Sequence, residues 1–226
     1  MSKLEIKGLY KNYPEGGLVT EVLKDINLEI NQGEFVLITG PSGSGKTTLL
    51  NCISGLETVT EGGVYLDDVD FSKFSKKQMA ELRKTKVGFV FQQYNLLPNL
   101  TLFENIQIAC VIACKNDTNK INTLLEKFNL LEFKNHFPNQ VSGGMQQRTA
   151  IVRALINDPE IIFADEPTGN LDSKSTVEVM ENFKYLHQEY KKTIIMVTHS
   201  LDNLKYATRH IKIIDGKVVL DEQINA

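Results

Sequence analysis

The chain has 226 residues, of which 25 are basic and 28 acidic, and a formal net charge of −3. This length allows one α/β domain with an added subdomain, or two small domains. A small acidic excess lacks the basic field that nucleic acid attracts, so we expect no nucleic-acid partner. The first residues lack the apolar core of a secretory signal, and no apolar run is long enough to cross a bilayer. We therefore expect a cytoplasmic chain.

The first third of the sequence predicts an antiparallel β meander followed by a strand and a helix. Alternating apolar residues flank a turn-rich segment at 14–17, which is typical of paired strands. An apolar run at 35–39 predicts a buried strand, and Gly55 marks the end of the helix after it. The elements predicted here are strands at 4–9, 22–30, 35–39 and 64–66, and helices at 46–55 and 76–83.

The middle of the sequence changes from strand-like to helical spacing. Residues 87–91 are a continuous apolar run, which predicts a strand buried on both faces. From Thr101 to about Leu131 the spacing is helical, and Thr101 with Glu104 predicts a capping box at the start of a helix. We predict a helical subdomain at about 95–158 within a single domain that covers 1–226.

In the last part, short apolar strands alternate with helices. The predicted strands are 161–164, 193–197 and 211–214, the helices are near 143–157, 174–190 and 201–207, and a hairpin lies at 215–216. This alternation predicts an α/β fold with a mixed, mainly parallel core sheet. The three cysteines lack metal-ligand or redox spacing, so each is expected to be a small buried apolar residue.

A glycine-rich segment with the sequence GPSGSGKT lies between the strand at 35–39 and the helix after it. Such a P-loop turns its backbone N–H groups toward phosphate oxygens, and the helix adds its positive N-terminal dipole. Lys46 is expected to reach the β- and γ-phosphates and the Thr47 hydroxyl to hold Mg²⁺. The flanking strand and helix disfavour a chance glycine loop. The predicted nucleotide contacts are Gly40, Pro41, Ser42, Gly43, Ser44, Gly45, Lys46, Thr47 and Thr48.

Two carboxylates, Asp165 and Glu166, follow the apolar strand at 161–164. Ligands bind at this edge of an open α/β sheet. Asp165 is expected to hold the metal, and Glu166 to polarise an attacking water. In isolation the pair would be interpreted as a solvated strand end, but the presence of the phosphate loop favours the catalytic interpretation.

The segment VSGGMQQR, which contains Ser142, Gly143 and Gly144, opens a predicted helix. Here the sequence resembles the ATP-binding-cassette (ABC) ATPases, a family of P-loop NTPases whose signature is Leu-Ser-Gly-Gly-Gln. The resemblance covers essentially the whole chain, because several motifs occur in the order typical of the family. The other matching positions are Tyr13, Gln92, the D-loop Asn170-Leu171-Asp172, and His199.

The resemblance implies a role for each matching position. Tyr13 stacks on adenine, Gln92 contacts the metal and the attacking water, and His199 assists Glu166 in hydrolysis. Gln93 is adjacent to Gln92 and remains an alternative for its role.

The family also implies a shared site. Ser142, Gly143 and Gly144 serve the ATP held by a second, facing subunit, and Asp172 crosses the same interface. ATP binding would then close a head-to-tail homodimer and hydrolysis would reopen it. Met145 stands where the signature has glutamine, and its side chain donates no hydrogen bond, which implies slower hydrolysis or weaker ATP binding.

The segments 88–98, 101–106 and 167–175 are similar to the lipoprotein-release and macrolide-export group of bacterial ATPases. That likeness implies a separate integral membrane permease, a location on the cytoplasmic face of the membrane, and export or extraction of a peptide, lipoprotein or amphipathic drug. The alternative within the group is a mechanotransmission ATPase of the cell-division type, which moves no substrate. A third class, soluble ABC ATPases of translation or DNA repair, needs two cassettes, coiled-coil arms or a basic face, and the sequence has none of these.

Apolar residues next to Gln92 are expected to dock a helix of the permease. Ordinary subdomain core is the alternative, and we expect some of these residues to serve each purpose. They are Leu96, Leu97, Leu100, Leu102 and Phe103.

Overall fold

The structure is a computed structural model that describes residues 3–16, 18–115 and 117–224. Its strands are β1 (Lys3–Glu15), β2 (Leu18–Asn31), β3 (Phe35–Thr39), β4 (Glu61–Leu66), β5 (Val69–Asp70), β6 (Val87–Val90), β7 (Ile161–Asp165), β8 (Thr193–Val197), β9 (Arg209–Ile214) and β10 (Lys217–Gln223). Its α-helices are α1 (Lys46–Ile53), α2 (Lys76–Thr85), α3 (Leu102–Ile112), α4 (Thr118–Lys127), α5 (Gly143–Leu155) and α6 (Ser173–Tyr190). Its 3₁₀ turns are η1 (Phe71–Lys73), η2 (Leu131–Phe133), η3 (Pro138–Gln140) and η4 (Leu201–Tyr206).

The described strands form two sheets. The larger has the order β10-β9-β3-β8-β7-β6, with every pair parallel except β10 against β9. The smaller is antiparallel, with the order β2-β1-β4-β5. The predicted mixed core sheet and antiparallel amino-terminal meander are both confirmed.

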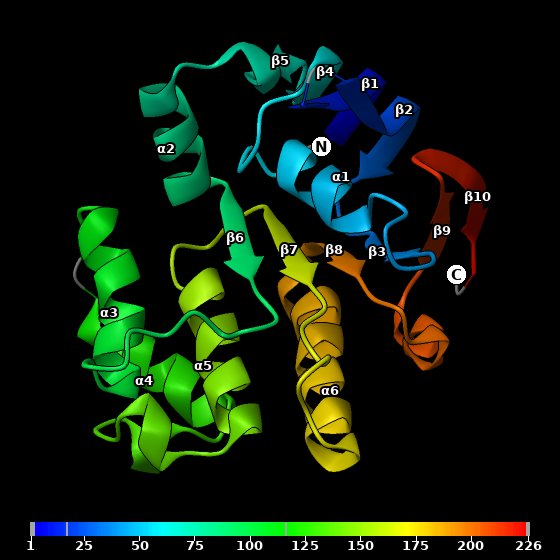
Figure 1. Ribbon diagram of the computed structural model, residues 1–226. Helices are drawn as coiled ribbons and strands as arrows, with labels where there is room; N and C mark the ends of the chain where they lie inside the picture. Colours follow the sequence, from blue (N-terminus) through cyan, green and yellow to red (C-terminus); the bar gives the residue numbers. More distant parts are fainter. Residues whose placement is uncertain (1–2, 17, 116, 225–226) are drawn as a thin grey trace.

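The larger sheet lies between two apolar layers. One layer combines α1 and the antiparallel sheet with one face of the parallel strands, through side chains such as Val36 and Ile195. The other layer combines α3 to α6 with the opposite face, through side chains such as Leu37 and Ile194. Because neighbouring residues of a strand point to opposite faces, the continuous apolar runs of β3 and β8 satisfy both layers. Figure 1 shows α1 and α6 on opposite sides of the parallel strands.

Helices α3, α4 and α5 lie together at one end of the molecule (Figure 1). Helix α3 starts at a capping box, as predicted, because the Thr101 and Glu104 side chains each accept from the other's backbone N–H. The apolar side chains of these helices join the same cluster as one face of the parallel sheet. The boundary of a helical subdomain at 95–158 therefore stays a prediction.

The helix predicted near 201–207 is present as the 3₁₀ helix η4. Two other local predictions are wrong. Strand β6 lies at the edge of the larger sheet, and its Val87 and Phe89 are only half-buried because both line an open groove. Cys114 is exposed beyond the end of α3, although Cys52 and Cys110 are buried as expected.

Candidate functional site

The loop between β3 and α1 is closed around its own lysine. Gly40 and Gly45 have φ values of 151° and 98°, in the region that suits glycine. A Cβ at Gly45 would also come within 2.9 Å of Leu23 Cδ2. Lys46 Nζ donates to Gly40 O at 3.0 Å and to Pro41 O at 2.9 Å. Its positive charge therefore stays beside the loop whose amides are predicted to bind phosphate.

An acidic side chain faces the first turn of α1. Thr47 Oγ1 donates to Asp165 Oδ1 at 3.1 Å. Burial raises the pKa of the Asp165 carboxyl, although the Thr47 hydroxyl and the Lys46 ammonium lower it. A hydroxyl and a carboxylate oxygen at this separation fit a hard cation such as Mg²⁺. The described residues contain no cluster of three or more His, Cys, Asp or Glu that would hold a metal.

Glu166 and His199 meet where β7 and β8 end. Glu166 Oε2 and His199 Nε2 are in direct contact, with Glu166 14% exposed and His199 65% exposed. Glu166 has a φ of 45°, which is unusual for a residue with a side chain and costs about 1–3 kcal/mol where it occurs. Its backbone is fixed on both sides, since its N–H donates to Val197 O at 2.9 Å and its carbonyl accepts from Gly169 N at 3.0 Å.

These groups surround one cavity of about 330 Å³. It is lined by Val22, Ser42, Gly43, Gly45, Lys46, Thr47, Thr48, Glu166 and His199. The structure thus brings the phosphate loop together with the predicted base and histidine. An anionic ligand in this cavity would lie between the Lys46 ammonium and the Glu166 carboxylate.

Tyr13 lies on β1 near the start of α1 and is held by two charged residues. Its hydroxyl donates to Glu57 Oε1 at 2.5 Å, and Lys11 Nζ lies 4.8 Å from the centre of its ring. Burial and the Glu57 carboxylate raise the pKa of Tyr13 to about 12. Lys11 also pairs with Glu57 at 3.2 Å. The ring is therefore fixed at one edge, while its role as an adenine platform stays a prediction.

Gln92 lies against the D-loop rather than in the phosphate cavity. Its Nε2 donates to Asn170 Oδ1 at 3.3 Å, and Asn170 Nδ2 donates to Gln92 O at 3.3 Å. Gln92 is half-buried, whereas Gln93 is exposed. Gln92 is absent from the lining of the phosphate cavity, and its contact with metal stays a prediction.

The signature residues form a second group, away from the lining of the phosphate cavity. Ser142 caps α5, because its Oγ accepts from Met145 N at 3.3 Å. Asp172 caps α6, since its Oδ1 accepts from Ser175 N at 2.9 Å. Hydrogen bonds from the Ser175 backbone and side chain lower the pKa of the Asp172 carboxyl. A Cβ at Gly144 would lie 2.9 Å from Ser175 Oγ, so the two helix starts pack closely. Met145 is half-buried against the apolar cluster, and its effect on hydrolysis stays a prediction.

Sequence reasoning missed residues that support the predicted ones. Lys11 and Glu57 hold Tyr13, although 46 positions separate them in the sequence. Gln147 is fully buried on α5 and bonds to carbonyls in the loops after β6 and β7. One signal was available for Gln147, because it lies three and four positions after Gly144 and Gly143, on the same face of the helix.

Comparisons with known proteins agree with this geometry. The profile of the ABC transporter family matches residues 23–169. An uncharacterised ABC transporter ATP-binding protein of Methanocaldococcus jannaschii, MJ0796, is 42% identical over 228 residues, which cover 98% of this chain and 97% of that protein. A solved dimeric structure of MJ0796 bound to ADP and Pi superposes with a TM-score of 0.91 at 40% identity, covering 99% of both chains.

A second kind of relative is longer. The macrolide export ATP-binding/permease protein MacB of Campylobacter fetus is 44% identical over 226 residues, which are 99% of this chain but 35% of MacB. Among the described residues, the structure contains no helix long and apolar enough to span a membrane. With a family profile over more than half of its length and full-length relatives above 40% identity, the chain belongs to the ABC transporter family as an ATP-binding cassette.

Proposed function

We propose that this cassette hydrolyses ATP as a head-to-tail homodimer. In this way it would drive a separate membrane permease that exports or extracts a peptide, lipoprotein or amphipathic drug. One observation carries the dimer: the phosphate cavity contains Lys46, Glu166 and His199, whereas Ser142 to Gly144 are absent from its lining. A second copy would supply the signature residues. The dimeric, ADP-bound relative supports this arrangement.

The chemistry follows from charge and proton transfer. Glu166 would take a proton from water as the oxygen attacks the γ-phosphorus, and the bond to the bridging oxygen of ADP would break. Lys46 would stabilise charge on the phosphates, and His199 would hold Glu166 in place. Mg²⁺, held by Thr47 and Asp165, would neutralise phosphate charge when bound.

A mixing experiment tests whether the site is shared. Lys46→Ala disables the phosphate loop and Ser142→Arg blocks the signature, so each variant alone should be inactive. In a head-to-tail heterodimer one site combines the two intact halves, so an equal mixture should recover about a quarter of the unchanged activity. Phosphate release from each variant and from the mixture is the measurement. An inactive mixture of two folded variants would contradict the shared site.

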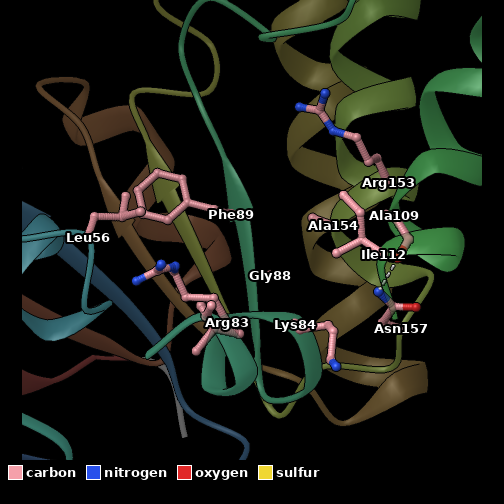
Figure 2. Close-up of a pocket in the computed structure, with 12 residues that line it drawn as sticks. Leu56, Arg83, Lys84, Gly88, Phe89, Ala109, Ile112, Arg153, Ala154 and Asn157 are labelled. Carbon is pink, nitrogen blue, oxygen red and sulfur yellow. Dashed lines mark hydrogen bonds between the residues drawn. The ribbon is translucent and has the colours of Figure 1, made fainter. Parts of the chain in front are cut away.

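A groove at the β6 edge of the larger sheet suits a permease segment. It has a volume of about 370 Å³ and lies between α2 and β6 on one side and α3 and α5 on the other. Figure 2 shows Leu56 and Phe89 facing Ile112 across it, with Arg83 and Arg153 on the two walls. Such a lining favours a helix with an apolar face and an acidic residue.

This groove modifies the docking surface expected from the sequence. Leu102 is fully buried and serves the core, and Leu96 and Phe103 pack against the same cluster. Leu97 is 45% exposed and remains available for docking. The docking surface proposed here is therefore the groove, with the exposed Leu97 as a separate apolar contact.

The two exposed residues at the end of α3 allow a matched test. Ile112 is 63% exposed and lines the groove, whereas Val111 is 59% exposed and does not. Ile112→Asp should lower co-purification with the permease at least about tenfold, because it places a charge on an apolar contact. Val111→Asp should leave co-purification unchanged. Equal losses in both variants, or none in either, would contradict docking in the groove.

The exported cargo is a further part of the proposal. It draws on the macrolide export relatives, of which this chain matches about a third. With the permease present, ATPase stimulation by a peptide, lipoprotein or amphipathic drug would support export. A partner with an enzyme-activating domain and no cargo stimulation would instead favour mechanotransmission.

A further inference from the structure

Gln147 occupies an unusual position between three functional segments. It is on the first turns of α5, after Ser142 to Gly144, and it is fully buried. Its Nε2 donates to Phe91 O at 3.3 Å and to Pro167 O at 2.7 Å. Phe91 directly precedes Gln92, and Pro167 directly follows Glu166. One carboxamide therefore joins the signature helix to the backbone beside two predicted catalytic residues.

The loop that carries Glu166 depends on such contacts. Glu166 has a positive φ, a conformation that persists only where the surroundings hold it. The residue after it is Pro167, which has no backbone N–H to donate. Only the carbonyl of Pro167 can therefore take part in a backbone hydrogen bond. Gln147 donates to it from outside the loop and so fixes the peptide next to the strained residue.

The Gln92 loop and the D-loop are packed together within the same network. Besides the paired bonds between Gln92 and Asn170, a Cβ at Gly169 would come within 2.7 Å of Gln92 Nε2. The Gln147 Nε2 bonds to the carbonyl of Phe91, directly before Gln92, and to the carbonyl of Pro167, between Glu166 and the D-loop. Its Oε1 is buried and has no donor among the described residues. A side chain that leaves a buried acceptor unpaired is poorly explained by stability alone.

We propose that Gln147 is a positioning residue for ATP hydrolysis. It transmits the placement of the signature helix to Glu166 and to the Gln92 loop. This inference rests on the proposed ATP hydrolysis. A shift of α5 on contact with a second subunit would move the Pro167 carbonyl and, with it, the Glu166 carboxylate. Gln147 itself touches no nucleotide.

Two substitutions separate positioning from simple structural support. Gln147→Met keeps length and volume but donates no hydrogen bond, so it should lower kcat at least tenfold while the KM for ATP changes less than twofold. Gln147→Glu donates only when its carboxyl is protonated, and burial raises the pKa of such a group. Relative to the unchanged chain, its kcat should therefore rise as the pH falls from 8 to 6. Gln147→Met should show no such rise.

Gln146→Met is the matched control. Gln146 is the adjacent carboxamide and donates to Val141 O within its own segment at 3.3 Å. Its substitution should leave kcat and the pH profile unchanged. A purely structural role for Gln147 predicts the opposite pattern, in which melting temperature falls and both Gln147 variants lose kcat without a pH signature.

A readout independent of activity is hydrogen exchange. Peptides covering 166–170 should exchange faster in Gln147→Met, while peptides covering β3 should not change. Unchanged exchange together with a kcat within twofold of the parent would overturn the proposal. If the parent chain hydrolyses no ATP, the proposed function fails and the proposal fails with it. If the parent hydrolyses ATP and both Gln147 variants behave as the parent does, the failure belongs to the Gln147 inference alone.

Discussion

Glu166→Gln is expected to lower ATP hydrolysis at least about 100-fold, the usual contribution of a general base, while ATP binding is preserved. Glutamine has nearly the same shape as glutamate, so the φ of 45° at this position and the bond to Val197 O can remain. The carboxamide can also accept a hydrogen bond from His199. What it cannot do at neutral pH is take a proton from water.

The same substitution should make the dimer visible. When binding closes the dimer and hydrolysis opens it, a chain that binds without hydrolysing accumulates in the closed state. Gel filtration should therefore show a dimer of Glu166→Gln with ATP and a monomer without it. In the unchanged chain the dimer should be transient under the same conditions.

The control for this prediction is a glutamate with the same chemistry in another place. Glu181 is 54% exposed on α6, and its pair with Lys184 spans 4.0 Å. Glu181→Gln should leave phosphate release unchanged. Hydrolysis by Glu166→Gln at a rate near that of the unchanged chain would show that Glu166 is not the base.

Local chemistry explains why much of the fold could be predicted. The capping box of Thr101 and Glu104 spans three positions, so the interaction is contained in the sequence itself. The hairpin at Asp215 and Gly216 is similar, since both residues adopt the positive φ that such turns require. Patterns of this kind depend on no distant part of the chain.

Burial, in contrast, depends on what lies beside a segment. The apolar run of β6 looks like a central strand, but the strand order places it at the sheet edge, where Phe89 faces the groove. The predicted helix after β8 forms, but as a 3₁₀ helix that packs against β3 rather than as an α-helix. Cys114 lies one position past the α3 C-cap, in a turn with φ of 55° that leaves it in solvent. Tertiary context decided each of these.

The candidate site likewise contains residues that the sequence predicts and residues that it does not. Lys46, Thr47 and Glu166 belong to motifs whose spacing predicts their chemistry, and the structure brings them to one cavity. Gln147 and Lys11 lack such motifs, because their partners are brought near only by folding. Polar residues that support a site through long-range contacts are therefore the class that sequence reasoning misses.

Arg209 is another residue with long-range polar contacts, and its substitution should have a large effect on stability. Its guanidinium makes two bonds of 2.7 Å to Asp221, one of 3.0 Å to Glu34 and one of 2.6 Å to Glu29 O. These contacts join β9 to β10, to β2 and to the turn before β3. The two carboxylates raise the pKa of Arg209, which keeps it charged.

Arg209→Leu should lower the free energy of unfolding by about 3 kcal/mol, because Glu34, which is 14% exposed, would lose its cation. Breaking a buried ion pair costs about 3–5 kcal/mol. The loss here should lie at the low end of that range because Asp221 is 35% exposed and can be solvated. For a chain of this size the melting temperature should fall by about 6–12 °C. Lys184→Leu, at an exposed pair on α6, should change the free energy of unfolding by less than about 0.5 kcal/mol.

Adding Glu34→Gln to Arg209→Leu distinguishes the origin of the loss. If the cost comes from leaving a carboxylate buried without its cation, neutralising Glu34 should recover part of the lost stability. If the cost comes from lost packing of the arginine side chain, the second substitution should recover none. Urea unfolding of the single and double variants measures the coupling. A loss below about 1 kcal/mol in Arg209→Leu would mean that the contacts joining β9 to its neighbours are redundant with the strand ladder.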